Sequence, residues 1–155
     1  MKNSELDRRS NTSGQGLVVV IILLAIIAGG AWWLFNNKQT MDREARAFGR
    51  QMIERLTVNH DAAFFANHLS PQARLDNPLS EQQYIMSKLQ ELGVPAQPIQ
   101  IDEKITWESH FFEPRGFFTA HLIYAEQTAT LQIAVSQPVS KWQLDSINIT
   151  YSRPR

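Results

Sequence analysis

An uncharged apolar segment dominates the N-terminal part of this 155-residue chain. The run Leu17–Phe35, LVVVIILLAIIAGGAWWLF, holds 19 residues without a charged side chain. As a helix it would span roughly 28 Å, which matches the hydrocarbon core of a bilayer. Trp32 and Trp33 stand at its C-terminal end, where indole rings favour the headgroup level. The segment therefore predicts a single transmembrane helix, followed by a chain long enough for one compact domain.

Two kinds of leader sequence are alternative interpretations of this segment. A cleaved signal peptide has a shorter apolar region and ends in small residues. Here bulky residues end the run, and only the stretch Ala28–Ala31 offers a place for cleavage. A prepilin leader is suggested by Gly14-Gln-Gly16, but the Glu that usually follows five residues after the processing site is replaced by Val19 or Ile21. A retained membrane anchor is thus the favoured interpretation, with a pilin-like subunit as a weaker one.

Positive side chains flank the apolar segment on both sides, so charge alone does not decide its orientation. A short tail is most simply left in the cytoplasm, whereas long domains translocate largely regardless of charge. We therefore predict a cytoplasmic N-terminus and a periplasmic C-terminal domain, with the helix in a bacterial inner membrane. The chain has no cysteine, which fits an envelope protein and excludes disulfides, thiolate metal sites and cysteine nucleophiles.

This interpretation divides the chain into four parts. Residues 1–16 form a polar tail that we expect to be disordered, residues 17–35 the transmembrane helix, residues 36–40 a linker, and residues 41–155 a soluble domain. The formal net charge of the chain is zero, and the part after the anchor is close to neutral. Nucleic-acid binding needs a basic surface to neutralise phosphates, so the composition gives no support for it.

The soluble domain begins with the periodicity of an amphipathic helix over residues 40–56. Its apolar residues recur at intervals of three and four: Met41, Ala45, Phe48, Met52, Ile53 and Leu56. Asp42 with Arg46, and Arg50 with Glu54, are opposite charges four residues apart on the polar side. Two alternatives remain for its start: the helix continues from the anchor, or it is broken at the Asn-Asn pair between them.

Two short helices follow in the stretch NHDAAFFANHLSPQARL. Asn59 or Asp61 can serve as the N-cap of the first, because short polar side chains accept hydrogen bonds from free helix N–H groups. Ser70 followed by Pro71 is typical of an N-cap and a first-turn proline for the second. These residues predict a break in the helical chain near Leu69.

A further helix is indicated by signals at both ends. Ser80 and Gln83 match a capping box, and Leu79 with Tyr84 matches a hydrophobic staple. Gly93, followed by a proline two residues later, is typical of a helix end. The residues expected to face the core are Ile85, Leu89 and Leu92.

The rest of the chain changes to a period of two. Apolar and polar residues alternate over residues 99–107, 118–124 and 129–135, which predicts three half-buried strands. We expect a fourth strand in SKWQLDSINITYS, and together they make an α+β domain in which the helices pack on one curved four-stranded antiparallel sheet.

The pattern of the fourth strand changes phase within its length. Trp142 and Leu144 share one phase, whereas Ile147, Ile149 and Tyr151 share the other. The change falls between them, at the Asp-Ser pair of residues 145–146. An extra residue in one strand has this effect, so we predict a β-bulge there.

The order of elements resembles the nuclear transport factor 2-like (cystatin-like) superfamily of cone-shaped α+β domains. The residues that carry the resemblance are the helix-breaking stretch NHDAAFFANHLSPQAR, Gly116 at the start of GFFTAHLIYAE, and the late Trp in KWQLDSINI. The resemblance covers residues 41–151. Many bacterial envelope proteins of this class pair such a domain with an N-terminal anchor, and one group is the periplasmic scaffold component of type IV secretion systems. The resemblance implies a fold, and a fold alone does not give a function.

Enzymes of this superfamily, such as steroid isomerases and dehydratases, place an Asp, His or Tyr inside the mouth of the cone. The comparable residues here are Trp107, His121 and Tyr124. The alternation around Phe118 points His121 away from the core, which counts against it as a general base. The acids occupy polar phases of the strands or the bulge: Asp102, Glu103 and Asp145. We therefore predict no catalytic residue and no cofactor.

The four histidines raise the question of a metal site. They are His60, His68, His110 and His121. No two of them stand four residues apart, as the ligands of a helical zinc site do. We interpret them as surface or packing residues and predict no metal site.

The segment ESHFFEPRGFF concentrates aromatic residues around a proline and an arginine between two predicted strands. One interpretation is that these rings cover the open end of the sheet. The other is an exposed contact surface, because aromatic residues and Arg dominate interface hot spots. The candidate partner-contact residues are Phe111, Phe112, Arg115 and Phe117.

These observations favour a membrane-anchored interaction or assembly module that is not an enzyme. Its expected partners are membrane lipid, through the anchor, and either envelope proteins or a second copy of itself. A small-ligand-binding or enzymatic cone is the alternative. A deep hollow with converging polar groups would favour that alternative, whereas an interior filled by Phe and Trp would favour the interaction module.

Overall fold

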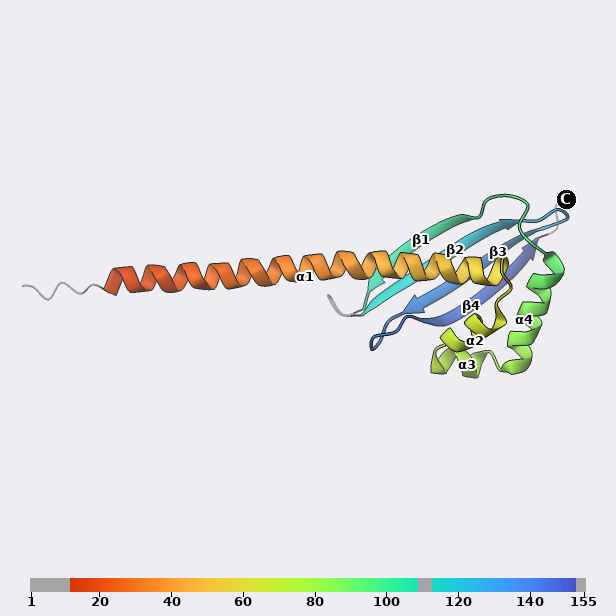
Figure 1. The fold of residues 1–155 in the computed structure, drawn as a ribbon, viewed down its shortest axis with the longest axis horizontal. Coiled ribbons are helices and arrows are strands. Elements are labelled where there is room, and N and C mark those ends of the chain that lie inside the picture. Colours follow the sequence, from red (N-terminus) through yellow and green to blue (C-terminus); the bar gives the residue numbers. More distant parts are fainter. Residues whose placement is uncertain (1–11, 109–112, 153–155) are drawn as a thin grey trace, which may run out of the picture. The chain divides into compact units, whose positions relative to one another are not determined.

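The computed structural model describes residues 12–108 and 113–152 of the chain. Within these residues, four helices precede four strands, so the predicted α+β class is confirmed (Figure 1). The chain divides into two compact units, residues 1–38 and residues 39–155. Helix α1 (Thr12–Thr57) contributes residues to both units.

Residues 36–40, the predicted linker, are helical, and the boundary between the two units falls among them. The expected disorder of the tail is wrong for residues 12–16, which form the first turn of α1; residues 1–11 lie outside the described residues. Of the two alternatives for the amphipathic helix, the structure has the continuous one. Asn lowers helix propensity by less than about 1 kcal/mol per residue, and an established helix propagates one residue at a time. Two Asn residues between strong helical segments therefore do not end the helix.

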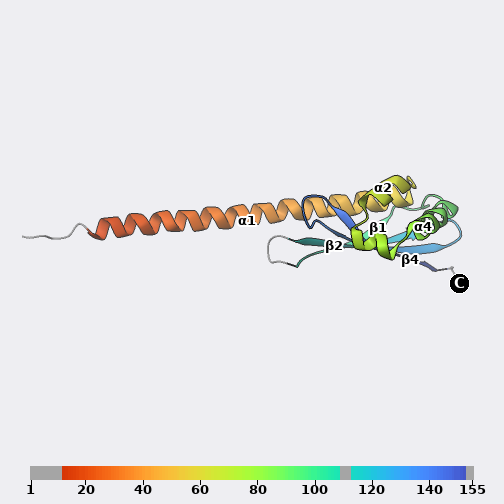
Figure 2. The ribbon, with the colours of Figure 1, turned by 90° about the horizontal axis from the view of Figure 1, so that it is seen from below.

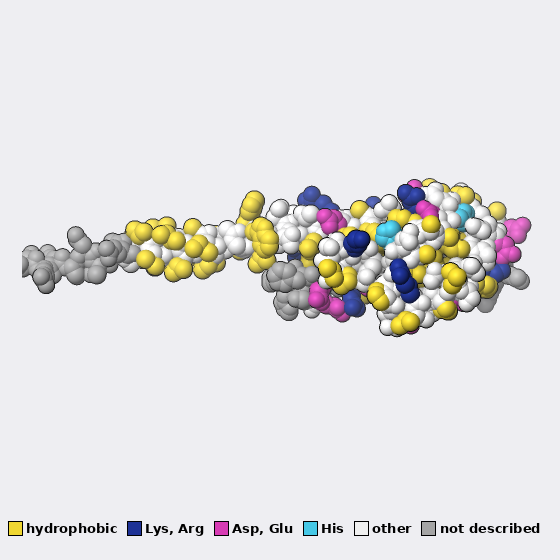
Figure 3. Space-filling view, turned by 60° about the horizontal axis from the view of Figure 1, so that its bottom comes forward, with side chains coloured by type: hydrophobic (Ala, Val, Ile, Leu, Met, Phe, Trp, Pro, Cys, Tyr) yellow, Lys and Arg dark blue, Asp and Glu magenta, His cyan; other side chains and the backbone are white. Residues whose placement is uncertain are grey.

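In the first unit, the helical residues expose apolar side chains in every direction. Ile22 is 53% exposed and Trp32 is 72% exposed, and the large apolar side chains between them are exposed as well. Figure 3 shows this apolar surface along the helix. Among the described residues, α1 is the one helix that is long and apolar enough to cross a membrane. A helix that is apolar all round is stable only where its surroundings are apolar too.

In the second unit, α1 buries the side predicted from its periodicity. Met52, Ile53 and Leu56 have no exposed surface and belong to the core of the domain. Gly49 allows the closest approach to the sheet, because a Cβ atom on this residue would lie 2.3 Å from the ring of Phe118. The helix backbone therefore rests directly on that ring, which a larger residue would prevent.

The caps of the two short helices agree with the sequence. In α2 (Ala62–His68), the side chain of Asp61 accepts a hydrogen bond from the Phe64 N–H, 2.9 Å away. In α3 (Pro71–Asp76), the hydroxyl of Ser70 accepts one from the Ala73 N–H, 3.1 Å away, and proline stands in the first turn. Each cap satisfies a helix N–H that would otherwise lack a partner.

The predicted start of the next helix is wrong. Helix α4 (Leu79–Leu92) has Pro78 as its N-cap, without a side-chain cap, and not Ser80. The carbonyl of Pro78 accepts a hydrogen bond from the Gln82 N–H at 3.0 Å, so the helix begins before the expected capping box. Leu79 and Tyr84 are 67% and 55% exposed, which excludes the predicted staple. The helix ends at Gly93 as expected, with a positive φ of 75° that suits glycine.

The four strands form one antiparallel sheet in the order β1-β2-β3-β4 (Figure 1). They are β1 (Gln100–Trp107), β2 (Pro114–Ile123), β3 (Thr128–Ser136) and β4 (Gln143–Ser152). The inner face carries the buried alternate residues, such as Phe118 in β2 and Leu131 in β3. Residues 39–57 of α1, together with α2, lie over this inner face (Figure 2). The other face is polar, in agreement with the alternation in the sequence.

The predicted bulge is present in β4. Val135 pairs with Leu144 and Ala134 with Ser146, so Asp145 is the extra residue. This residue shifts the alternation by one position. As a result, Leu144 and Ile147 contact the same core, although the unshifted pattern places them on different faces.

The polar side of α1 is bound to strand β1. The guanidinium of Arg50 donates to Glu103, with Nη2 and Oε1 2.7 Å apart, and Arg46 lies 3.9 Å from the same carboxylate. Asp42 accepts a hydrogen bond from the indole N–H of Trp107 at 3.2 Å. The charged side chains of the helix thus contact the sheet. The ion pairs of Arg46 and Arg50 with Glu103 differ from the pairs within the helix that the sequence predicts.

Candidate functional site

The space between the helices and the sheet is filled by side chains. Its largest fully buried members are Phe65, Phe118, Met52 and Ile53. Trp142 stacks on Phe48 with ring centroids 6.1 Å apart and closes the same core from the side of β4. The interior between the helices and the inner face of the sheet is thus occupied by aromatic and aliphatic side chains.

The three residues compared with superfamily active sites do not come together. Trp107 is half-buried and donates its indole N–H to Asp42. His121 lies on the polar face of the sheet, where its Nε2 is 3.3 Å from Asp102 and both side chains are largely exposed. Tyr124 lies on the inner side and is only 5% exposed. The three side chains thus have three separate environments.

Tyr124 has an unusual environment for a polar group. Its hydroxyl is buried and has no hydrogen-bond partner. Burial, with a smaller contribution from Tyr151, raises the pKa of Tyr124 to about 12. The phenol is therefore protonated at neutral pH and cannot act as a base there. It lines a hollow of about 300 Å³ together with Leu92 and Gln127.

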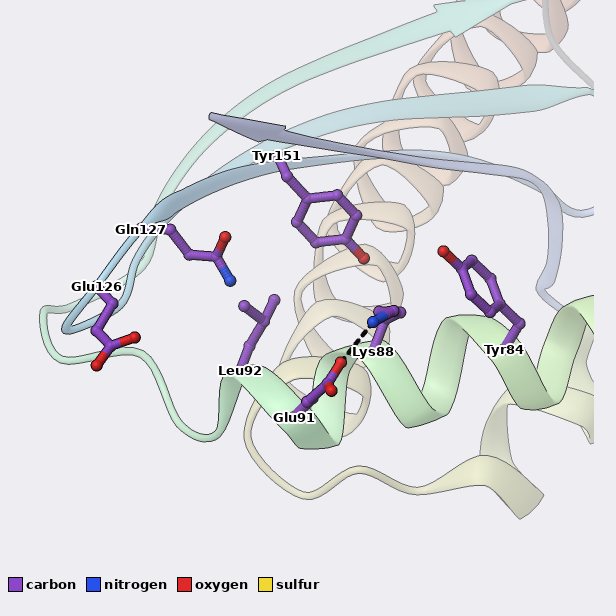
Figure 4. A pocket seen from close by; sticks show the side chains of 7 residues that line it. All are labelled: Tyr84, Lys88, Glu91, Leu92, Glu126, Gln127 and Tyr151. Carbon is purple, nitrogen blue, oxygen red and sulfur yellow. Dashed lines mark hydrogen bonds and ion pairs between the residues drawn. The ribbon is translucent and has the colours of Figure 1, made fainter. Parts of the chain in front are cut away.

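A second hollow lies next to it, between α4 and the end of β4 (Figure 4). It has a volume of about 420 Å³. Its residues come from α4, from the turn between β2 and β3, and from the end of β4: Tyr84, Lys88, Glu91, Leu92, Glu126, Gln127 and Tyr151. No local sequence motif indicates this hollow, because the three contributing segments are far apart along the chain.

This hollow combines two phenol rings with an ion pair. The rings of Tyr84 and Tyr151 face the same space from opposite walls (Figure 4). Lys88 and Glu91 are paired with each other, with Nζ and Oε2 2.6 Å apart, and this contact raises the pKa of Lys88. Burial raises the pKa of Tyr151, so it is a neutral hydroxyl at physiological pH. None of these groups forms the nucleophile–base pair that covalent or acid–base chemistry needs.

The predicted partner-contact residues fall in two classes. Phe111 and Phe112 lie outside the described residues. Arg115 and Phe117 were expected between two strands. They belong instead to strand β2, which begins at Pro114. Their side chains are exposed on the polar face of the sheet, and Phe117 is 44% exposed. Alternation explains this result, because Phe118 takes the buried position.

Phe117 has uncharged neighbours on the side of β3 and β4, whereas Lys104 of β1 pairs with it on the other side. A hollow of about 320 Å³ lies beside its ring and is lined by Thr119, Gln132, Ala134, Ser146 and Asn148 among others. Arg115 stands two residues before Phe117 on the same face, and its Nη2 is 3.0 Å from a carboxylate oxygen of Glu108. The two side chains thus present an aromatic ring and a guanidinium to the outside.

The histidines in the described residues do not converge. His60 contacts the carbonyl oxygen of Leu89 at 3.0 Å, and His68 contacts that of Phe64 at 2.8 Å. His68 also lies against the Phe48 ring, so both histidines are packing residues and His121 is a surface one. His110 lies outside the described residues. Within residues 12–108 and 113–152, no group of three His, Cys, Asp or Glu side chains could hold a metal ion.

Comparison with known proteins identifies no relative of this chain. No family model matches the sequence, and no curated protein and no solved structure matches it.

Proposed function

We propose that this chain is a single-pass protein of the bacterial inner membrane whose periplasmic domain is a non-enzymatic interaction module. The observation that carries this proposal is a contrast within the domain. Aromatic and aliphatic side chains fill its interior, whereas Phe117 and Arg115 stand exposed on its polar sheet face. We infer a domain of the nuclear transport factor 2-like type, and its filled interior supports contact with partners through its surface.

The anchor supports the first half of the proposal. Its apolar side chains remain exposed in every direction, which is unfavourable in water and favourable in lipid. We place the N-terminal tail in the cytoplasm and the domain in the periplasm, because long domains are translocated largely regardless of charge and a short tail can stay on the cytoplasmic side. The domain would then work close to the membrane surface.

The outer face of the sheet supports the second half. Phe117 is a large ring among Thr, Gln and Asn side chains, and Arg115 is close by on the same strand. An exposed aromatic ring with an arginine beside it is a composition enriched at interface centres. The expected partner is an envelope protein that buries the Phe117 ring.

Site-specific photo-crosslinking in living bacteria tests this proposal. A photoreactive residue placed at Phe117 should capture a discrete partner, whereas the same residue placed at Gln72 should not, since Gln72 is exposed on α3 and not on the strand that carries Phe117. Phe117→Asp should then reduce co-purification of the captured protein, and Gln72→Asp should leave it unchanged. Equal crosslinking from both positions would remove the support for a contact surface on the sheet.

A small-ligand-binding domain is the second candidate, and the hollow between Tyr84 and Tyr151 is the observation that favours it. The two phenols and the paired Lys88 and Glu91 could hold an uncharged ring with hydrogen-bonding groups. Ligand-detected NMR with a library of such compounds tests this candidate. Binding that is lost in Tyr151→Ala and kept in Phe117→Ala would favour it over the interaction module.

A further inference from the structure

The turns of the sheet are divided between its two ends. Strands β1 and β3 run in the same direction, because each of them is antiparallel to β2 between them. The turn between β3 and β4 therefore lies at the end where β1 finishes, and the turn between β2 and β3 lies at the opposite end (Figure 1). The two turns thus have different neighbours in the domain.

Helix α1 enters the domain at the end of the sheet that holds the β3–β4 turn. The indole N–H of Trp107, the last residue of β1, donates to Asp42 of α1 at 3.2 Å. Trp142, which follows the β3–β4 turn, stacks on Phe48 of α1 with ring centroids 6.1 Å apart. Both sides of this end of the sheet therefore contact the first turns of α1 within the domain.

A short piece of chain joins this end of the domain to the apolar segment. The domain begins at Gln39, and Phe35 is the last residue of the apolar segment. Four residues extend to at most about 14 Å. With residues 17–35 in a bilayer, this end is held within reach of the bilayer surface. The β2–β3 turn is separated from it by the nine residues of β3, which span about 30 Å.

The β3–β4 turn exposes an apolar residue. Val139 is 92% exposed, the highest value among the large apolar side chains of the described residues. Pro138 and Ser140 on either side of it are exposed as well. Turns favour Gly, Asn, Asp and Ser, which adopt turn geometry easily, and a β-branched aliphatic residue lacks this property. Val139 therefore serves neither the turn nor the core.

The charges of the two turns are opposite. Lys141 is the single charged residue near Val139, and the sequence has no acid between Glu126 and Asp145. The β2–β3 turn, residues 125–127, carries Glu126 and no large apolar residue. An aliphatic side chain with a lysine beside it matches a membrane interface, where the apolar part reaches the acyl boundary and the ammonium group reaches the phosphates.

We propose that the β3–β4 turn is a second membrane contact, in which Val139 enters the interface of the bilayer that holds the anchor and Lys141 contacts the lipid phosphates. The proposal goes beyond the proposed function and depends on its anchor, not on its partner surface. One aliphatic side chain gives weak binding for a free domain. The tether makes this contact effective, because it keeps the turn at a high effective concentration near the surface.

Site-specific fluorescence of the full chain in phosphatidylethanolamine and phosphatidylglycerol vesicles tests the contact. The chain has no cysteine, so one introduced Cys carries the single dye. An environment-sensitive dye on Val139→Cys should shift its emission to the blue, and lipids spin-labelled near the headgroup should quench it. The same dye on Glu126→Cys should show neither effect. Equal quenching at the two positions would overturn the proposal.

Val94 provides a matched apolar control at the opposite end of the sheet. Its side chain is 60% exposed, and the nearby Ala96 N–H donates to the Ile123 carbonyl at the end of β2, 2.7 Å away. A dye on Val94→Cys should remain unquenched, since apolar exposure alone does not bring a residue to the bilayer. Quenching as strong as at residue 139 would contradict a contact specific to the β3–β4 turn.

Substitutions in the turn separate the role of Val139 from that of the dye. With the dye on Ser140→Cys, Val139→Leu should keep the quenching. Val139→Asp should lower the ratio of membrane-bound to free turn about tenfold, because a charge replaces a side chain that the interface favours. Lys141→Glu should weaken the quenching, and no change would refute the phosphate contact. These side chains are exposed, so the variants should fold normally, which circular dichroism verifies.

The outcomes separate this proposal from the proposed function. Quenching at residue 140 that survives Val139→Asp would refute the entry of Val139 into the bilayer. Crosslinking from Phe117 to an envelope protein would still support the interaction module in that case. Release of the wild-type chain from membranes by alkaline extraction would instead contradict the anchor, on which both proposals depend.

Discussion

Residues 17–35 and residues 39–57 belong to the same helix, but they have opposite requirements of their surroundings. The first stretch is apolar on all sides and leaves its side chains exposed. The second buries one side, including Met52 and Leu56, against its own domain and carries charges on the other. Both stretches form a helix, but the distribution of apolar residues around the helix decides what must cover it. Matched substitutions in the two stretches test this difference.

The largest effect is expected from charges in the first stretch. Leu23→Arg with Ile27→Arg should release the chain from the membrane, because each Arg near the centre of a spanning helix costs about 2.5–3.5 kcal/mol. Ala47→Arg with Gln51→Arg has the same spacing on exposed positions of the second stretch and should leave membrane attachment unchanged. Alkaline extraction of membranes measures both. Equal extraction of the two variants would contradict the assignment of residues 17–35 as the anchor.

The second effect is a cavity in the second stretch. Leu56→Ala should lower the free energy of unfolding of the domain by about 2–5 kcal/mol, because Leu56 has no exposed surface. Leu24→Ala removes the same atoms from a side chain that is 60% exposed and should leave domain stability unchanged. Urea unfolding of the solubilised chain, followed by tryptophan fluorescence, compares them. A similar loss in both would mean that the first stretch also packs on the domain.

The third effect separates two glycines of one helix. Gly49→Ala should destabilise the domain by about 1–3 kcal/mol through overpacking, because its Cβ would lie 2.3 Å from the Phe118 ring. Gly30→Ala meets nothing within 4 Å and should leave the domain unaffected. Thermal unfolding measures the two variants. Combining Gly49→Ala with Phe118→Leu should give less than the sum of the single losses, since the ring is the obstacle.

The smallest effect is expected on the solvated side of the second stretch. The hydrogen bond to Glu103 raises the pKa of Arg50, and both partners of this pair are accessible to solvent. Arg50→Gln should therefore cost less stability than Gly49→Ala, and added salt should diminish the loss. Arg43→Gln, on an exposed position of the same stretch, is the control. A large loss of stability that does not depend on salt would contradict the solvent-accessible ion pair between Arg50 and Glu103.

Local patterns predicted much of the fold. The alternation around Phe118 placed His121 on the outer face, and the phase change in the last strand located the bulge at Asp145. The caps at Asp61 and Ser70 depend on hydrogen bonds across three residues, so short motifs were sufficient for them. The expected capping box failed because the Pro78 carbonyl starts α4 earlier.

The candidate sites were predicted less completely. The exposure of Phe117 followed from its place next to a core residue, but its membership in β2 depended on pairing with β1 and β3. The hollow between Tyr84 and Tyr151 joins residues more than sixty positions apart, so no local motif indicates it. Arg46 and Arg50 of α1 also pair with a residue distant in the sequence, because Glu103 comes within reach only when β1 packs beside the helix.

The sequence by itself determined the apolar anchor, the order of helices and strands, and the inner and outer residues of each strand. These properties depend on neighbouring residues and on the geometry of single elements, with periods of 3.6 and 2. Only the tertiary structure decided that the interior is filled, that Arg50 pairs with Glu103, and that the β3–β4 turn lies at the end of the sheet where α1 enters the domain. Those features arise from contacts between segments far apart in the chain, whose positions are set by packing and not by local preference.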